Sequence, residues 1–105
     1  MPFKDVELSR NSKTIEWLKT ELLNRVAALH HNLLQRREEE VTESLADIII
    51  TSYLLARRLG ITFPRLDGRI TAKLRINIEE PHQVESWFGD LTALRTYLAG
   101  DREET

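Results

Sequence analysis

The stretch EEEVTESLADIIITSYLLARRL, residues 38–59, decides the fold, because it begins with acidic side chains and continues as a long apolar segment. Gly60 follows it directly, and glycine is typical of helix ends. Arg57 and Arg58 also favour a helix, since cations near its end offset the helix dipole. The run IIITSYLL within it leaves a strand as the alternative. The length and the glycine predict one helix, apolar around nearly its whole circumference and therefore buried on several sides.

Three acidic side chains of this stretch recur at helical spacing, namely Glu40, Glu43 and Asp47. On a 3.6-residue helix they share one face within roughly 60° of arc. Acidic groups in a first turn complement the positive end of the helix dipole, which gives the early glutamates a structural interpretation. Asp47 lies too far along the helix for that explanation. A cation or strong donors are therefore expected opposite Asp47, and Mg²⁺ is one candidate because it prefers carboxylate oxygens.

The residues before this stretch predict a second helix. Its apolar positions form one narrow stripe after a cap at Asn11 or Ser12. They are Ile15, Leu18, Leu22, Val26, Leu29 and Leu33. The charged residues 35–39 form the turn, and so short a link requires the two helices to run antiparallel.

Two further helices are expected after Gly60. Thr62 is a suitable cap for one that ends before Pro81, and Asp90 is a suitable cap for a short one that ends before Gly100. The aromatic side chains are expected to complete the core rather than to stack on a nucleobase. They are Trp17, Trp87, Phe88 and Tyr97.

The predicted fold is an all-α antiparallel bundle of about four helices. Residues 1–10 are expected to form a flexible arm, residues 11–100 the helical domain and residues 101–105 a frayed tail. A chain of 105 residues buries a limited core by itself, so a homodimer or homotetramer is expected to cover part of the apolar helix.

Composition excludes several classes of function. The 15 Lys and Arg and the 17 Asp and Glu are mixed along the chain, so no basic surface for direct nucleic-acid binding is expected. The absence of cysteine excludes disulfides, thiolate zinc sites and cysteine nucleophiles. No apolar run approaches the roughly 20 residues of a spanning helix, and the N-terminus lacks the apolar core of a signal peptide. A cytoplasmic protein with no membrane partner is expected.

Three segments resemble the MazG-type nucleotide pyrophosphohydrolases, and in particular a branch of short, single-domain MazG-like proteins. They are LLNRVAAL at 22–29, ESLAD at 43–47 and KLRIN at 73–77. Sequence similarity to the same branch in IEWLKTELL, RRLGITFPRLD and WFGDLTAL extends the resemblance from Thr14 to Leu98. The resemblance implies an all-α oligomer in which two antiparallel helices supply a Glu-x-x-Glu and a Glu-x-x-Asp pair. These pairs bind Mg²⁺, and water attacks a nucleoside triphosphate to release pyrophosphate.

The residues at the motif positions depart from that pattern. The acidic positions of the first motif are held by Asn24, Arg25 and Ala28. In the second motif Glu43 and Asp47 match, but Ser44 stands where the metal-binding glutamate of the pair is expected. Of the four ligands that the resemblance implies, only Asp47 remains. Lys73 and Asn77 match positions that the resemblance associates with phosphate contacts.

Three interpretations of Arg25 follow. It replaces the metal and forms a forked pair with Asp47 or Glu43 across the helix interface. Alternatively, Glu21 joins Glu40, Glu43 and Asp47 as a rebuilt Mg²⁺ site, and Arg25 moves away because like unit charges about 4 Å apart cost about 4 kcal/mol at an effective dielectric of about 20. In the third interpretation, Glu21 and Arg25 form an i,i+4 surface pair worth a few tenths of a kcal/mol.

Two functions are compatible with these residues. One is a MazG-like protein with a degenerate pyrophosphohydrolase site, acting as a non-catalytic assembly or nucleotide-sensing module. The alternative is an active Mg²⁺-dependent nucleoside triphosphate pyrophosphohydrolase with the rebuilt acidic site and with Lys73 and Asn77 on phosphate. No residue is identified as catalytic.

Overall fold

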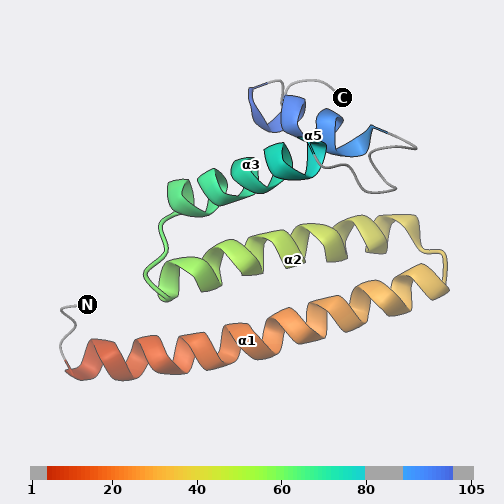
Figure 1. The fold of residues 1–105 in the computed structure, drawn as a ribbon. Coiled ribbons are helices and arrows are strands. Elements are labelled where there is room, and N and C mark those ends of the chain that lie inside the picture. Colours follow the sequence, from red (N-terminus) through yellow and green to blue (C-terminus); the bar gives the residue numbers. More distant parts are fainter. Residues whose placement is uncertain (1–4, 80–88, 101–105) are drawn as a thin grey trace. The chain divides into compact units, whose positions relative to one another are not determined.

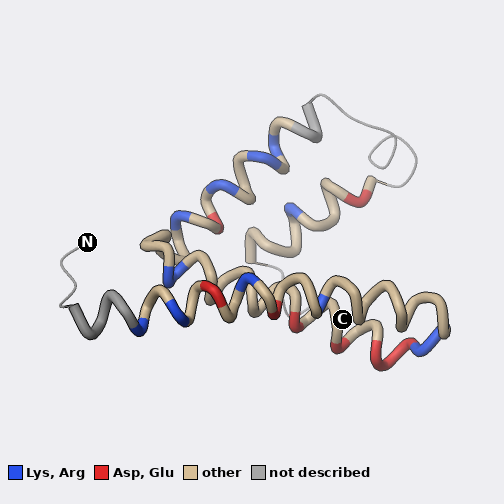
Figure 2. Tube along the Cα trace, turned by 90° about the horizontal axis from the view of Figure 1, so that it is seen from below, with Lys and Arg blue, Asp and Glu red and all other residues tan. Residues whose placement is uncertain are grey.

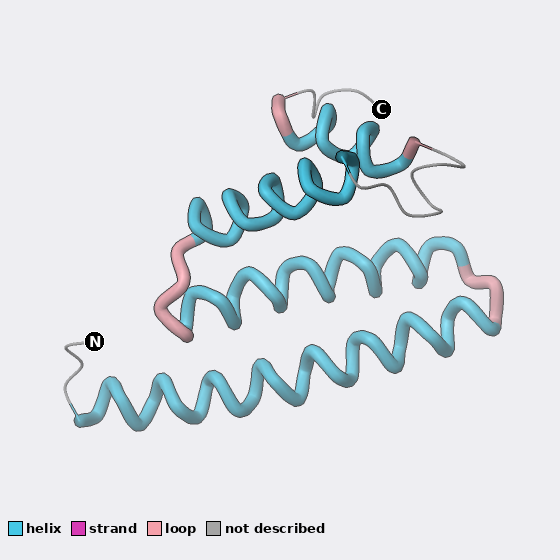
Figure 3. The backbone as a smooth tube through the Cα atoms, in the orientation of Figure 1, coloured by secondary structure: helices cyan, strands magenta, loops and turns pink. Residues whose placement is uncertain are grey.

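A computed structural model describes residues 5–79 and 89–100 of the chain. In these residues every regular element is an α-helix (Figure 3), which confirms the predicted fold class. The helices are α1 (Asp5–Leu34), α2 (Glu38–Arg58), α3 (Phe63–Glu79) and α5 (Asp90–Leu98), labelled as in Figure 1. They fall into two compact units, Met1–Phe63 and Pro64–Thr105.

The first unit is a hairpin in which α1 and α2 lie side by side and antiparallel (Figure 1). Its turn closes with two backbone hydrogen bonds, from Arg37 N–H to the Asn32 carbonyl at 3.1 Å and from Arg36 N–H to the Leu33 carbonyl at 3.2 Å. The backbone of Arg36 adopts the left-handed conformation, with φ of 55°. This is the Schellman end of a helix, with an arginine where glycine is usual. Acidic residues follow the basic turn directly, at the start of α2 (Figure 2).

The predicted end of α2 at Gly60 is confirmed, and it uses the same motif. Ile61 N–H donates to the Ala56 carbonyl at 2.9 Å, and Gly60 N–H donates to the Arg57 carbonyl at 3.1 Å. Gly60 has φ of 90°, a conformation that glycine adopts without a steric penalty.

The start of α1 differs from the sequence-based prediction. The helix begins at Asp5, so neither Asn11 nor Ser12 caps it, and helical backbone extends into the segment assigned to an arm. Asn11 instead lies within the helix and reaches across the hairpin, where its Nδ2 donates to the Arg58 carbonyl at 3.1 Å. The side chain thereby satisfies a carbonyl in the last turn of α2, which has no partner within its own helix.

Small side chains fill the hairpin interface on the α2 side. Ser44 and Thr51 are buried and, seven residues apart, share the face of α2 that bonds to Asn32 of α1. Leu18 of α1 is 3% exposed. Small residues allow two helix axes to approach closely. Consequently the larger apolar residues of α2 are not all buried within the chain, and Ile49 and Ile50 are each 56% exposed.

The aromatic residues also depart from the expectation of a filled core. Trp17 is 59% exposed and Tyr97 is 40% exposed, so the assignment of both to the core is wrong. Trp87 and Phe88 lie outside the described residues.

The second unit contains α3 and α5. Helix α3 begins directly after Thr62 and ends at Glu79, as predicted, and Leu74 is buried. Helix α5 begins one residue earlier than expected. Gly89, with φ of 65°, occupies the N-cap position without a side-chain cap, and Asp90 is the first helical residue. None of the described helices is both long and apolar enough to cross a membrane.

Candidate functional site

Arg25 lies between two carboxylates on different helices. Its Nη2 is 3.3 Å from Oε2 of Glu21, one turn earlier on α1. Its Nη1 is 3.8 Å from Oδ2 of Asp47 on α2. The antiparallel register of the hairpin brings Asp47 opposite this turn of α1. We refer to Glu21, Arg25 and Asp47 as the charge cluster.

The charge cluster is half-exposed rather than buried. The side chains are 22% exposed at Glu21, 43% at Arg25 and 42% at Asp47. The Nε atom of Arg25 is buried, and no atom of the described residues hydrogen-bonds to it. Ion pairs with this degree of exposure contribute about 0–1 kcal/mol each, because water and salt screen them.

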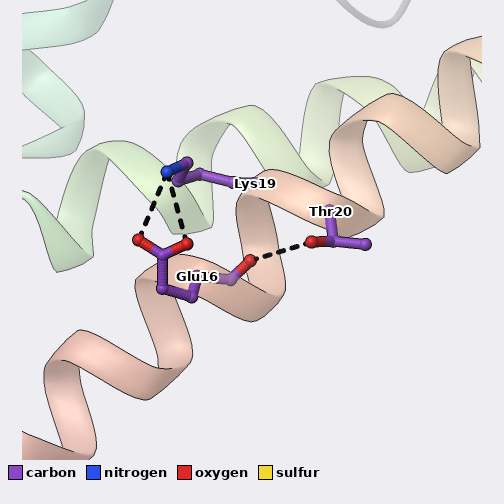
Figure 4. Close-up of polar contacts among 3 residues, drawn as sticks. All are labelled: Glu16, Lys19 and Thr20. Atoms are coloured by element: carbon purple, nitrogen blue, oxygen red, sulfur yellow. Dashed lines mark hydrogen bonds and ion pairs between the residues drawn. The ribbon is translucent and has the colours of Figure 1, made fainter.

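A second ion pair on α1 shows what a purely local contact looks like. Lys19 Nζ is 3.2 Å from Oε1 and 3.3 Å from Oε2 of Glu16, and Thr20 Oγ1 donates to the Glu16 carbonyl at 3.2 Å (Figure 4). Both charged side chains are more than half exposed, and all three residues belong to the same helix. Arg25 differs because one of its two contacts joins α1 to α2.

Arg25 therefore combines two of the interpretations drawn from the sequence. The i,i+4 pair with Glu21 is formed, and so is a cross-helix contact with Asp47. The expected fork onto one carboxylate is not formed, because the two terminal nitrogens contact different carboxylates. The guanidinium is thus the centre of the group rather than one half of a pair.

Ser44 has a structural environment that the sequence does not reveal. It is 5% exposed, and its Oγ accepts a hydrogen bond from Nδ2 of Asn32 at 3.0 Å. The same amide nitrogen lies 3.3 Å from the Glu40 carbonyl. The position that the resemblance assigns to a metal-binding glutamate is therefore part of the helix interface. Asn32 was missed by the sequence reasoning; its spacing of seven residues from Arg25, which places both on one face of α1, is the signal that could have identified it.

The other predicted ligands do not join the charge cluster. Glu40 and Glu43 are exposed on α2, and the described contacts of Arg25 do not include Glu43. Over residues 5–79 and 89–100, no three acidic or histidine side chains are grouped so as to hold a metal ion. As arranged, the donor set does not fit Mg²⁺, because the guanidinium occupies the space between Glu21 and Asp47.

The predicted phosphate-binding residues belong to the second unit. Lys73 and Asn77 lie one turn apart on α3, and the Lys73 side chain is exposed.

Comparison with known proteins gives one finding. A model described as the MazG-like family matches residues 8–91, a range that includes the whole charge cluster, Ser44 and Lys73. Neither the curated proteins nor the solved structures contain a match to the chain.

Proposed function

The chain belongs to the MazG-like family, and from this premise we propose that it is a non-catalytic member that serves as an assembly or nucleotide-sensing module. In this proposal Arg25 takes the place of the metal ion. One observation carries the proposal, namely that the Arg25 guanidinium lies between Glu21 and Asp47.

Charge supports this assignment. Three of the four ligand positions that the resemblance implies hold Arg25, Ala28 and Ser44, none of which offers a carboxylate. A divalent ion about 4 Å from the guanidinium would be disfavoured by about 8 kcal/mol at an effective dielectric of about 20. In this proposal the Arg25 guanidinium, rather than a metal ion, supplies the positive charge opposite Asp47.

The rebuilt Mg²⁺ site of Glu21, Glu40, Glu43 and Asp47 is the competing hypothesis, and calorimetry separates the two. The experiment titrates Mg²⁺ and Mn²⁺ into the protein with and without a non-hydrolysable nucleoside triphosphate, for wild type and Asp47→Asn. We expect no metal-dependent heat in either protein. Metal binding that is present in wild type and lost in Asp47→Asn would overturn the proposal.

A turnover assay tests directly whether the protein is catalytic. Wild-type protein incubated with nucleoside triphosphates and Mg²⁺ should release no pyrophosphate above the buffer control. Release that disappears in Asp47→Asn, with the helical circular dichroism unchanged, would identify an active pyrophosphohydrolase instead.

Nucleotide sensing is proposed to use α3. Lys73 offers an exposed cation and Asn77 lies one turn further along, which is the arrangement that the resemblance associates with phosphate contacts. Calorimetry with the non-hydrolysable triphosphate alone tests this half of the proposal. Binding that Lys73→Gln leaves unchanged would exclude this use of α3.

Assembly is supported by the apolar surface of the hairpin. Several large apolar side chains of α1 and α2 are more than two-fifths exposed: Leu23, Val26, Leu33, Leu34, Leu45, Ile49, Ile50 and Leu54. Exposed apolar side chains in this number favour an interface, and a second copy of the chain in a homodimer or homotetramer is the proposed partner. Sedimentation of wild type and Ile49→Glu tests this; a wild-type monomer at every concentration would contradict it.

A further inference from the structure

A pocket of about 390 Å³ lies toward the open end of the hairpin, where α1 begins and α2 ends. Three residues of each helix line it: Thr14, Trp17, Leu18, Leu54, Arg57 and Arg58. We refer to these six residues as the arginine pocket. None of them belongs to the charge cluster, although Trp17 lies one turn before Glu21.

One part of the arginine pocket is apolar. Leu18 is almost fully buried and Leu54 lies across from it on α2, whereas Trp17 is 59% exposed. An exposed indole keeps a large apolar surface in water, which is unfavourable by roughly 25 cal/mol for each Å² that a ligand could cover. A flat apolar ligand placed against Trp17 would remove that surface from water.

The other part is positively charged and lacks compensation. Arg57 and Arg58 follow Leu54 by three and four residues, so all three share one face of α2. Among the side chains that the structure describes, which do not include those of residues 5–9, neither arginine pairs with a carboxylate. Two adjacent guanidinium groups without a counterion favour an anionic ligand.

Arg57 and Arg58 are not needed as hydrogen-bond donors to the carbonyls at the end of α2. The carbonyls of the last turn of α2 already accept hydrogen bonds from Leu59, Gly60 and Ile61 and from Asn11. The guanidinium carbon of Arg57 lies 5.3 Å from the ring centroid of Phe63. That ring is in turn fixed edge-on against Tyr53, with centroids 5.8 Å apart. An aromatic contact of this kind uses none of the five N–H groups of a guanidinium in an ion pair.

We propose that the arginine pocket binds a small organic anion, with its flat apolar body against Trp17 and its charged group on Arg57 and Arg58. A pocket of this volume is within the range of small-molecule sites. The proposal goes beyond the proposed function because it needs neither a metal nor a triphosphate. An aromatic phosphate such as a nucleoside monophosphate and an aromatic carboxylate both meet the chemistry.

The test follows the indole N–H of Trp17 by NMR. The chain has two tryptophans, so the background variant Trp87→Phe leaves a single indole signal. It is titrated, without divalent metal, with AMP, 2-naphthoate, adenosine and inorganic phosphate. We expect AMP or 2-naphthoate, or both, to shift the signal saturably. Adenosine lacks the charge and phosphate lacks the apolar body, so each should bind at least about tenfold more weakly. The stronger of the two anions identifies the source of the ligand.

Two variants with matched loss of charge locate the site. Arg57→Gln with Arg58→Gln should weaken binding at least about tenfold, since each charge-assisted hydrogen bond contributes substantially. Arg36→Gln with Arg37→Gln removes two adjacent arginines at the closed end of the hairpin and should change the affinity less than about twofold. Raising the salt concentration on the background variant should weaken binding and requires no further mutation.

Three outcomes would overturn the proposal. The first is no saturable shift with either anion. The second is equal affinity in the two double variants, or an affinity that does not depend on salt. The third is an indole signal that moves with protein concentration in the absence of ligand, since this would mean that a second copy of the chain covers the arginine pocket.

Discussion

The charge cluster and the arginine pocket lie on the same hairpin, yet their arginines have different neighbours. In the charge cluster one guanidinium contacts two carboxylates, at 3.3 Å and 3.8 Å. In the arginine pocket two guanidinium groups lie beside an exposed indole, and one of them lies over a phenyl ring rather than near an acid. In the first region the guanidinium is paired with carboxylates of the chain, whereas the second is the region that we propose binds an anion.

The largest expected effect concerns Ser44, which lies on α2 one turn before Asp47 and bonds to Asn32 of α1. Ser44→Glu restores the residue that the family pattern implies. We expect it to lower the free energy of unfolding by about 3 kcal/mol, because it places a charged side chain at a 5% exposed position and removes the acceptor for Asn32. Urea unfolding measures the change.

Thr42→Glu is the control for this prediction. Thr42 is exposed on the same helix, so the same added carboxylate should cost less than about 0.5 kcal/mol. Equal costs at the two positions would show that Ser44 is not an interface residue.

The next prediction breaks the charge cluster itself. Arg25→Glu removes both ion pairs and places three carboxylates together, so we expect a loss of about 2 kcal/mol in the free energy of unfolding at low salt, reduced as salt is raised. Lys19→Glu is the matched control, because it reverses the charge of an exposed pair confined to α1 and should cost less than about 0.5 kcal/mol. If Arg25→Glu left stability and oligomeric state unchanged, the structural role of the charge cluster would be wrong.

The smallest expected effect on stability is that of replacing an arginine of the arginine pocket. Arg58→Gln should change the free energy of unfolding by less than about 0.5 kcal/mol, because no described carboxylate loses a partner. Arg25→Gln should cost about 1 kcal/mol under the same conditions. A larger loss at Arg58 than at Arg25 would mean that the open end of the hairpin depends on its arginines for folding.

The elements of the hairpin were predictable because local chemistry defines them. The acids that open α2, the glycine that closes it and the short turn before it all act within a few residues. Helix α2 begins at Glu38 as expected and ends at Arg58, one residue before the predicted Leu59. Glu38 and Glu39, assigned to the turn as well, belong to the helix. The first turns of α1 were not predicted. Asn11 is a good helix cap by sequence, but its amide is used across the hairpin on the Arg58 carbonyl, a contact between residues 47 positions apart.

The candidate site was predictable in its residues and not in its contacts. Helical spacing paired Glu21 with Arg25, and the motif positions of the resemblance linked Arg25 to Asp47 or Glu43. Neither revealed that Arg25 contacts Asp47 rather than Glu43, since both acids share a face of α2 and the register of the two helices selects between them. The family resemblance indicated that Ser44 departs from the pattern, while its hydrogen bond to Asn32 depends on that same register.

The sequence by itself determined the all-α class, the antiparallel hairpin and membership of the MazG-like family, because periodicity, turn residues and motifs are properties of short segments. Only the tertiary structure decided which acids contact Arg25, that Ser44 lies in the helix interface and that Trp17 is exposed beside Arg57 and Arg58. The physical reason is that each of these depends on the register between α1 and α2, and a shift of one residue would rotate a different set of side chains into the interface.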